Sequence, residues 1–340
     1  MLDPRLIERL WYGEDAAAQL ARAALWPAER LFGAAVGLRD LLYDAGWLRS
    51  ENTAIPAVSI GNLSVGGTGK TPVAAWIARG LADRGAKPAV VLSGYADDEP
   101  RVHRLLNSDV PVFTGRDRVA AIAEAAAAGA RLAVLDDAFQ HRRACRVADI
   151  VLVNADRFPG RARVLPAGPF REGLGALHRA TLVVVTRKAA TPAQVEVVHR
   201  RIAACVPTVP RVSVHLAPLA LQRLDSTETL PLGTLADREV RAVSGIADPS
   251  AFHAQLIALG ARVDARAWPD HHAFTRAEAE ELASAAPDAL VVCTLKDAVK
   301  LAPLWPRLGP PLWYVSQRVI VDRGEGGVDR VLDDLARAHS

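Results

Sequence analysis

The sequence predicts an α/β protein of the P-loop NTPase type, with a mostly parallel sheet flanked by helices. After Pro56, short apolar runs alternate with amphipathic stretches, which is the pattern of successive βα units. The first apolar run, 57–61, leads through a glycine-rich loop into an apolar helical stretch. A later run, 131–135, is followed by two aspartates. Together these observations indicate a doubly wound fold with a site at the carboxyl edge of its sheet.

The alternation continues to residue 294, and its elements follow in chain order. We expect strands at 57–61, 88–93, 131–135, 149–154, 181–186, 240–244, 262–267 and 289–294. We expect helices at 69–84, 116–128, 192–205, 249–259 and 275–285. The stretch 216–237 contains Pro218 and Pro231 and lacks helical periodicity, so we expect a hairpin or a crossing segment there.

The length of 340 residues exceeds that of a usual single domain, and 50% of the residues are hydrophobic. We therefore expect a P-loop core over 51–215 and a second, smaller α/β part over 216–340 that completes the cleft. The formal net charge is only +3 and the arginines are scattered, so no nucleic-acid partner is expected. The cysteines at 145, 205 and 293 form no C-x-x-C pair, which favours a reducing compartment.

Residues 1–50 are expected to form an amphipathic helical segment. Apolar residues recur there at roughly helical spacing, and charged residues such as Arg22, Glu29 and Arg39 fall between them. These charges interrupt every stretch long enough to span a bilayer, so a spanning helix is not expected. Two interpretations stay open: a helix packed on the domain, which the residues alone favour, and an interfacial membrane helix.

The loop after the first strand has the composition of a phosphate-binding loop. Its residues are Ser64, Val65, Gly66, Gly67, Thr68, Gly69, Lys70 and Thr71. The glycines let backbone N–H groups turn toward an anion, Lys70 adds a positive charge, and Thr71 offers a hydroxyl to Mg²⁺. Ser64 stands where the general motif has glycine. We expect ATP rather than GTP, because Thr294-Leu295-Lys296-Asp297 lacks the order of a guanine-reading motif.

Three polar segments supply candidate metal ligands and acid–base groups. Asp136 and Asp137 end an apolar strand, where P-loop enzymes hold Mg²⁺ directly or through water. Asp97-Asp98-Glu99-Pro100 follows another strand and is either a source of a general base or metal ligand, or a solvated turn. Trp268-Pro269-Asp270-His271-His272 precedes a helix, and one of its histidines is expected to serve acid–base or hydrogen-bonding chemistry rather than zinc binding.

In their order along the chain, these segments resemble the tetraacyldisaccharide 4'-kinase family of lipid A biosynthesis, and the likeness covers nearly the whole chain. It rests on the loop segment 59–72, with Ser64 included, and on five further motifs. These are Asp98-Glu99-Pro100, Leu135-Asp136-Asp137-Ala138-Phe139-Gln140-His141-Arg142, Leu165-Pro166-Ala167-Gly168-Pro169-Phe170-Arg171-Glu172, Pro269-Asp270-His271-His272 and Lys296-Asp297-Ala298-Val299-Lys300-Leu301.

The resemblance implies ATP-dependent, Mg²⁺-requiring phosphorylation of the 4'-hydroxyl of a tetraacylated glucosamine disaccharide 1-phosphate. By position, Asp98 is implied as the acceptor of the hydroxyl proton, His271 as its partner, and Lys70 as the group that stabilises the transferring phosphoryl. The implied Mg²⁺ ligands or positioning groups are Thr71, Glu99, Asp136 and Asp137. The implied phosphate or substrate contacts are Arg118, Arg171, Gln140 and His141.

The same resemblance implies where the protein works. The family's N-terminal amphipathic helix, which docks on the inner leaflet of the bacterial inner membrane, is similar to residues 15–47, and this favours the interfacial interpretation. The implied partners are the lipid-sugar substrate and a membrane surface on the cytoplasmic face, with peripheral or N-terminal anchoring. No obligate protein partner is inferred.

The sequence departs from the family's pattern at several positions. Ser93-Gly94-Tyr95 lacks the family's arginine, and only Ala96 and Asp97 separate it from the next motif. Ala138 replaces a glycine, and Val147 stands where the family usually has an acid. Two alternatives are therefore kept: a P-loop regulatory or assembly NTPase, and a degenerate kinase homologue that does not catalyse.

Overall fold

The computed structural model describes residues 4–94, 97–284 and 289–339. Its strands are β1 Ala57–Asn62, β2 Pro88–Leu92, β3 Val112–Thr114, β4 Leu132–Asp136, β5 Ala148–Asn154, β6 Leu182–Arg187, β7 Arg211–Gln222, β8 Thr229–Leu230, β9 Glu239–Ser244, β10 Arg262–Ala267, β11 Leu290–Thr294 and β12 Leu312–Arg323. Its helices are α1 Pro4–Tyr12, α2 Ala16–Ala24, α3 Trp26–Asp44, α4 Lys70–Asp83, α5 Asp98–Leu106, α6 Arg118–Ala127, α7 Pro192–Cys205, α8 Pro249–Ala258, α9 Arg276–Ser284, α10 Leu295–Leu301 and α11 Glu325–His339, with 3₁₀ helices η1 Leu174–Arg179 and η2 Leu232–Leu235.

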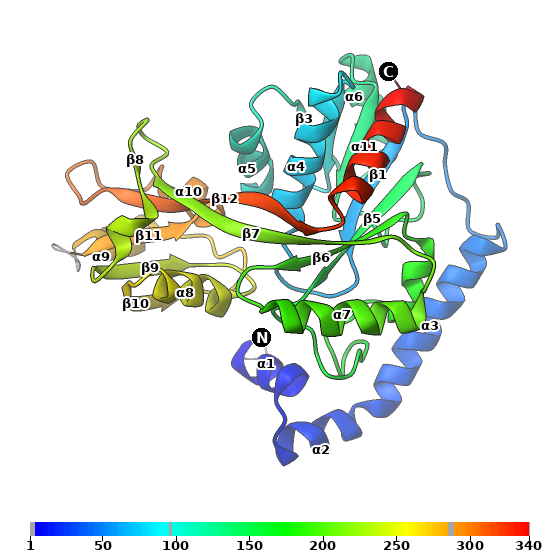
Figure 1. Ribbon diagram of the computed structural model, residues 1–340, viewed down its shortest axis with the longest axis horizontal. Helices are drawn as coiled ribbons and strands as arrows, with labels where there is room; N and C mark the ends of the chain where they lie inside the picture. The colour runs from blue at the N-terminus through cyan, green and yellow to red at the C-terminus, as the bar shows by residue number, and fades with distance from the viewer. Residues whose placement is uncertain (1–3, 95–96, 285–288, 340) are drawn as a thin grey trace.

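All of these strands belong to one 12-stranded sheet, in the order β10-β9-β11-β12-β7-β6-β5-β1-β4-β2-β3, with β8 paired to β7 beside this path. The strands from β3 to β7 run parallel to one another, and so do those from β12 to β10. The long strands β7 and β12 pair antiparallel and join the two parallel halves. Figure 1 shows this pair crossing the middle of the molecule.

Helices cover both faces of the larger parallel half. On one face, α4 and α11 pack over alternate residues of β1 and β5, including Val58, Ile60 and Ile150. On the other face, α7 packs on Val151 and Val183, while α6 packs beside β2 and β4. Because both faces are buried, the strands are almost continuously apolar, as expected for a parallel sheet.

The predicted fold class is confirmed. Each element expected between 57 and 294 is present with its ends within two residues of the expectation, although the expected helix end at Ala285 lies outside the described residues. The stretch 216–237 contains the end of β7, the short antiparallel strand β8 and η2. The expected domain boundary at 215 stays a prediction, and β7 runs across it.

Two expectations need correction. The acidic cluster Asp97–Pro100 was expected in a loop, but Asp98 begins α5, with Pro100 in the first turn, where its missing N–H costs little. The N-terminal segment was expected as one amphipathic helix, but it forms α1, α2 and α3. Pro27 lies at the start of α3, and a proline cannot continue the helical hydrogen bonds of α2.

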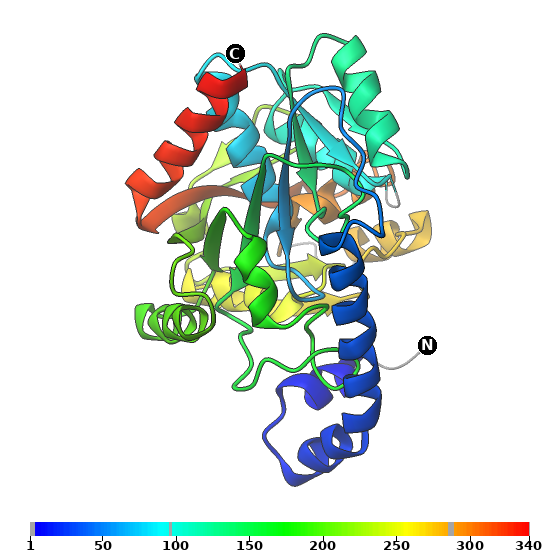
Figure 2. The same cartoon turned by 90° about the vertical axis from the view of Figure 1, so that its right-hand side faces the viewer.

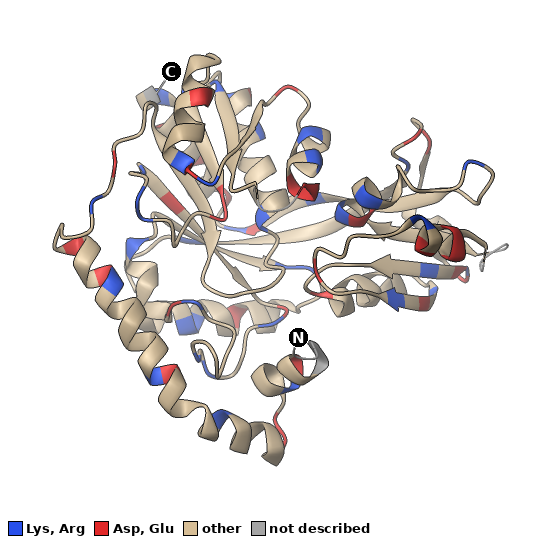
Figure 3. Cartoon of the chain, turned by 180° about the vertical axis from the view of Figure 1, so that it is seen from behind, with Lys and Arg blue, Asp and Glu red and all other residues tan. Residues whose placement is uncertain are grey.

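The N-terminal helices lie along one side of the sheet body. Figure 2 shows α3 running beyond this body, with α1 and α2 near its far end. Within residues 4–94, 97–284 and 289–339, no helix has both the length and the apolar composition needed to cross a bilayer. The mixed charges along α3 in Figure 3 agree with that finding.

Candidate active site

The phosphate-binding loop follows β1, which lies between β4 and β5 and is fully buried. Asn62, the last residue of β1, donates from Nδ2 to the Ser64 carbonyl at 2.7 Å and to Oγ1 of Thr68 at 2.9 Å. Thr186 Oγ1 in β6 donates to the Thr68 carbonyl at 2.9 Å. These bonds hold the loop between two strands before α4 begins at Lys70.

Glycine is required at some loop positions and not at others. Gly66 and Gly69 have φ values of 104° and 81°, in the left-handed region that favours glycine. A Cβ on Gly69 would also lie 2.3 Å from Cδ1 of Leu216. Ser64 is not among the described non-glycine residues with positive φ, so its backbone does not need glycine. This explains physically why serine can replace the first glycine of the general motif.

Asp136 ends β4 and is 4% exposed. Its Oδ2 accepts from Nε2 of His103 at 3.0 Å, whereas Oδ1 is buried without a hydrogen-bond partner among the described residues. Burial and the Asp136 charge raise the pKa of Glu99 above its ordinary value. The orphaned oxygen belongs to a carboxylate close enough to affect the pKa of Glu99, and Glu99 and Thr71 both line the cavity, so these three residues could hold a cation.

The donors suit Mg²⁺ in particular. Within the described ranges, no group of three His, Cys, Asp or Glu side chains is arranged to hold a metal ion. Mg²⁺ takes few protein ligands and keeps waters or substrate phosphate oxygens in its remaining positions. Asp136, Glu99 and Thr71 are therefore the residues that could hold such an ion together with a nucleotide.

Asp137 is engaged by cations rather than left free. Its Oδ1 lies 3.7 Å from Nζ of Lys70 and 3.1 Å from Nη1 of Arg171. Burial would raise the pKa of Asp137, but the charges of Lys70 and Arg171 outweigh it and hold the pKa below its ordinary value. Asp137 therefore orients the two cations that line the cavity beside it.

The other residues expected to contact phosphate or substrate differ in position. Arg171 lines the cavity and also donates to Oε1 of Gln140 at 3.3 Å. Gln140 in turn donates to the Asn62 carbonyl, and Arg118 is buried and donates to the Asp137 carbonyl at 3.4 Å. Burial, followed by the nearby arginines, lowers the pKa of His141, whose buried Nε2 has no hydrogen-bond partner among the described residues.

A second group of polar side chains lies on the opposite wall. His271 Nδ1 is 3.4 Å from Oδ2 of Asp98, and Lys296 Nζ is 3.0 Å from Nε2 of the same ring. Burial would raise the pKa of Asp98, but the contact with His271 and the charges of Lys296 and Lys300 lower it. The contact with Asp98 raises the pKa of His271, against burial and Lys296. Asp98 is therefore an ionised carboxylate at neutral pH.

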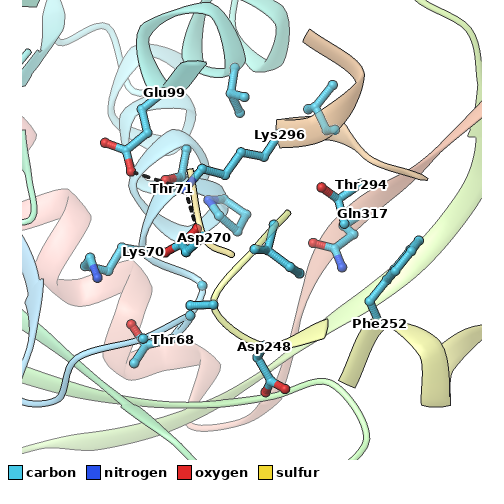
Figure 4. Close-up of a pocket in the computed structure, with 18 of the residues that line it drawn as sticks. Thr68, Lys70, Thr71, Glu99, Asp248, Phe252, Asp270, Thr294, Lys296 and Gln317 are labelled. Atoms are coloured by element: carbon cyan, nitrogen blue, oxygen red, sulfur yellow. Dashed lines mark hydrogen bonds and ion pairs between the residues drawn. The ribbon is translucent and has the colours of Figure 1, made fainter. Parts of the chain in front are cut away.

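One cavity of about 290 Å³ joins the two groups. Figure 4 shows Lys70, Thr68 and Thr71 of the loop on one side and Lys296, Thr294 and Gln317 on the other. The second side comes from β11, α10 and β12, together with Asp248 and Phe252 near the start of α8. The phosphate loop therefore faces His271 and Lys296 across this cavity.

Sequence reasoning missed two residues of this site. Lys296 was part of a guanine-reading pattern and of a family motif but was given no role, although a lysine just after a buried strand is a usual site signal. His103 lies inside a helix that was not predicted, so nothing in the sequence linked it to Asp136. Conversely, Asp97 has no described contact with the cavity, and Tyr95 and Ala96 lie outside the described residues.

The fold and the site define the class: a P-loop nucleotide-binding α/β protein with a histidine–carboxylate pair opposite its phosphate loop. Residues 21–337 match the family model described as Tetraacyldisaccharide-1-P 4'-kinase. The chain belongs to this family.

Relatives and a solved structure agree with this membership. The chain is 40% identical to "Tetraacyldisaccharide 4'-kinase" of Anaeromyxobacter sp. (strain K), over 87% of this chain and 86% of the relative. It is 36% identical to the protein of the same name from Halorhodospira halophila, over 87% and 88%. The crystal structure of LpxK from Aquifex aeolicus in complex with ATP is similar at a TM-score of 0.70 and 26% identity, and the match covers 94% of this chain and 99% of that one.

Proposed function

We propose that this protein transfers the γ-phosphoryl group of ATP to the 4'-hydroxyl of tetraacyldisaccharide 1-phosphate, a step of lipid A biosynthesis. The observation that carries the proposal is the cavity lined by both Lys70 and His271, with Asp98 buried in contact with His271, in a chain whose named relatives are tetraacyldisaccharide 4'-kinases. In the transfer, the 4'-oxygen bonds to the γ-phosphorus, the bond from that phosphorus to the ADP oxygen breaks, and the hydroxyl proton leaves.

Each wall of the cavity has its own part in this chemistry. The loop backbone from Ser64 to Thr71 binds the phosphates, and Lys70 stabilises charge on the group in transfer. Asp98 accepts the hydroxyl proton, and His271 is its partner. Arg171, held by Asp137, is a candidate contact for phosphate or substrate. Arg118, Gln140 and His141 do not line the cavity and are candidates that act through the residues that do.

Asp136, Glu99 and Thr71 would hold Mg²⁺, and Asp137 would position it or its waters. The ion would neutralise charge on the phosphates. The buried His103 would keep the Asp136 carboxylate turned toward the site, because it donates to Oδ2 and leaves Oδ1 free.

We also propose that the N-terminal helices rest on the cytoplasmic face of the bacterial inner membrane. Large apolar side chains of this segment are exposed: Leu6, Leu20, Trp26, Leu31, Leu38, Leu41 and Trp47. An unpartnered set of this size is unusual on a protein surrounded only by water, and an acylated substrate is itself found at a membrane.

The test is phosphate transfer from ATP to the purified tetraacyl disaccharide by wild type, Lys70→Ala and Asp98→Asn. Both variants are expected to lose most transfer, and Asp98→Asn is expected to keep ATP binding. Asp97→Asn is the matched control, because it makes the same change next to Asp98, and it should stay close to wild type. A folded, ATP-binding wild type that never phosphorylates the lipid would overturn the proposal and favour a degenerate homologue. GTP preference without any acceptor would favour a regulatory NTPase.

A further inference from the structure

Arg157 lies in the connection that follows β5 and contacts two segments that are distant from it in sequence. Its Nη2 forms an ion pair with Oε1 of Glu8 in α1, and its guanidinium carbon lies 5.1 Å from the centre of the Tyr12 ring. On the other side, its Nε is 3.6 Å from Oδ1 of Asp248. The Arg157 side chain is only 22% exposed, so one partly buried guanidinium joins the N-terminal helix α1 to the start of α8.

Asp248 places a carboxylate on the wall of the cavity that the phosphate loop faces. It is 2% exposed and lines this cavity (Figure 4), as do residues 66–71 of the loop. A Cβ on Gly67 would lie 3.8 Å from both the Cβ and the backbone nitrogen of Asp248, so the two segments are adjacent. Because the phosphates of ATP are negatively charged, an uncompensated carboxylate at this place would oppose their binding.

The backbone that carries Arg157 is itself attached to the phosphate loop. Nδ2 of Asn154, at the end of β5, donates to the Gly67 carbonyl at 3.3 Å, and Oδ1 of Asn154 accepts from the Asp156 N–H at 2.8 Å. The Asp156 carboxylate accepts from the three successive backbone N–H groups of residues 188–190, at 2.6–2.8 Å. The guanidinium of Arg157 is therefore held beside Asp248 by a fixed backbone, not by Asp248 alone.

We propose that Arg157 is a positioning residue for ATP, which compensates the charge of Asp248 and thereby lets the phosphates enter the cavity. Helix α1 then contributes to nucleotide binding as well, because Glu8 and Tyr12 hold the other side of the same guanidinium. The proposal rests on the proposed function only in taking ATP as the nucleotide. It includes no step of phosphate transfer, so it can be tested without the lipid acceptor.

The test is a double-mutant cycle of Arg157→Gln and Asp248→Asn, with the Kd of ATP measured by isothermal titration calorimetry on the full chain. Arg157→Gln should raise this Kd about 5- to 20-fold, because it leaves the Asp248 charge uncompensated. Asp248→Asn alone should stay within about twofold of wild type, but added to Arg157→Gln it should restore most of the affinity. Asparagine can still cap α8, where Oδ1 of Asp248 accepts from the Ala251 N–H at 3.3 Å.

Two further variants separate charge from packing. Arg157→Lys keeps the positive charge, so its Kd should lie between those of wild type and Arg157→Gln, and Asp248→Asn should again reverse the rise; this holds even where Arg157→Gln does not fold. Arg163→Gln is the matched control, because Arg163 lies in the same connection between β5 and η1 and pairs with Glu29 of α3 at 2.9 Å, with no described contact to Asp248. It should leave the Kd of ATP unchanged.

The outcomes separate this proposal from its alternatives. An unchanged Kd in Arg157→Gln, or a rise that Asp248→Asn does not reverse, would overturn the charge compensation. A loss of affinity in Asp248→Asn alone would make Asp248 a nucleotide ligand, and an equal gain from Asp248→Asn in both backgrounds would make the two charges independent; either would overturn it too. The expected cycle in a protein that never phosphorylates the lipid would instead overturn the proposed function and leave the role of Arg157 standing.

Discussion

His271 and Asp137 share a backbone conformation that side chains seldom adopt. Their φ values are 58° and 52°, and among the described non-glycine residues only Asp237 also has positive φ. Such a conformation costs about 1–2 kcal/mol. Both residues line the cavity, one on each wall. The strained backbone at these two positions therefore places the side chains of Asp137 and His271 at the cavity.

Gly61, the residue before the end of β1, shows how closely the strand that supports the loop is packed. A Cβ there would lie 2.5 Å from Cβ of Phe139 and 2.7 Å from its backbone nitrogen. We predict that Gly61→Ala lowers the free energy of unfolding by about 1–3 kcal/mol, because Phe139 is fully buried and cannot retreat. Urea unfolding measures this. Gly175→Ala, where a Cβ meets nothing within 4 Å, is the control, and an equal loss there would contradict the prediction.

At the scale of elements, the turn that carries His271 is held by the start of α9. Thr275 and Glu278 form a capping pair, with Thr275 N–H donating to Oε2 of Glu278 at 2.7 Å. Oε1 of Glu278 accepts from Trp268 and from His272, on either side of His271. One glutamate therefore joins a helix cap to the segment that positions the histidine.

This arrangement predicts a pH-dependent contribution to stability. The backbone hydrogen bond from Thr275, followed by its hydroxyl and His272, lowers the pKa of Glu278 from 4.5 to about 2. Because the folded-state pKa is depressed, the stabilisation is complete above about pH 4.5 and is lost as the pH falls toward 2. Glu278→Gln should cost about 1 kcal/mol near neutral pH, and its difference from wild type should shrink across that window. Glu281→Gln, on the same helix and exposed, is the control in urea unfolding; the same pH dependence there would count against the prediction.

Helix α3 is attached to the body by a partly buried charge network. Glu172, 2% exposed, accepts from Arg39 of α3 at 3.1 Å and from Arg179. Asp40 of α3 lies 2.9 Å from Nη1 of the same Arg179. Removing Glu172 would leave Arg39 and Arg179 with Asp40 as their remaining shared carboxylate, so part of the buried positive charge would be uncompensated.

We predict that Glu172→Ala lowers the free energy of unfolding by about 3–5 kcal/mol and makes α3 more sensitive to limited proteolysis. The control is Asp333→Ala, which breaks the exposed ion pair with Arg84 and should cost at most about 1 kcal/mol. Similar losses in the two variants, measured by urea unfolding, would show that the network does not act as a buried unit.

The elements that the sequence predicted and those that it missed differ in a physical way. Strands buried on both faces, such as β1 and β4, have continuous apolar runs that periodicity detects. By contrast, β12 mixes buried, partly buried and exposed residues. Helix α5 begins with two acids and a proline directly after Asp97, and these are typical turn residues. Of the site, the loop and Asp136 follow from local pattern, but the approach of Lys296 and His271 to Asp98 depends on packing between distant segments.

At the scale of the whole molecule, the formal net charge of only +3 gives little electrostatic attraction to an anionic membrane. Membrane binding would therefore depend on exposed apolar side chains, and Leu31 and Leu38 on α3 are 73% and 56% exposed. We predict that Leu31→Glu with Leu38→Glu weakens binding to phosphatidylethanolamine–phosphatidylglycerol vesicles at least about tenfold, because each buried leucine contributes roughly 1.5–3 kcal/mol.

Co-sedimentation with vesicles measures this binding, and transfer to detergent-dispersed lipid should be unchanged. The control carries Leu219→Glu with Leu308→Glu, which are exposed leucines far from α3 in sequence, at 48% and 103%. Equal vesicle binding by the wild type and the α3 variant would contradict membrane contact through this helix.

The return of β12 and α11 to the larger half of the sheet has a consequence for synthesis. Val328 and Leu332 of α11 complete the same core as Val73 and Ile77 of α4, directly behind the phosphate loop. During synthesis on the ribosome, the apolar surface of α4 that α11 covers in the folded protein therefore stays exposed until the segment 312–339 has emerged. Because Val315 and Gln317 of β12 line the cavity, we expect a growing chain to bind nucleotide tightly only after this strand has been made.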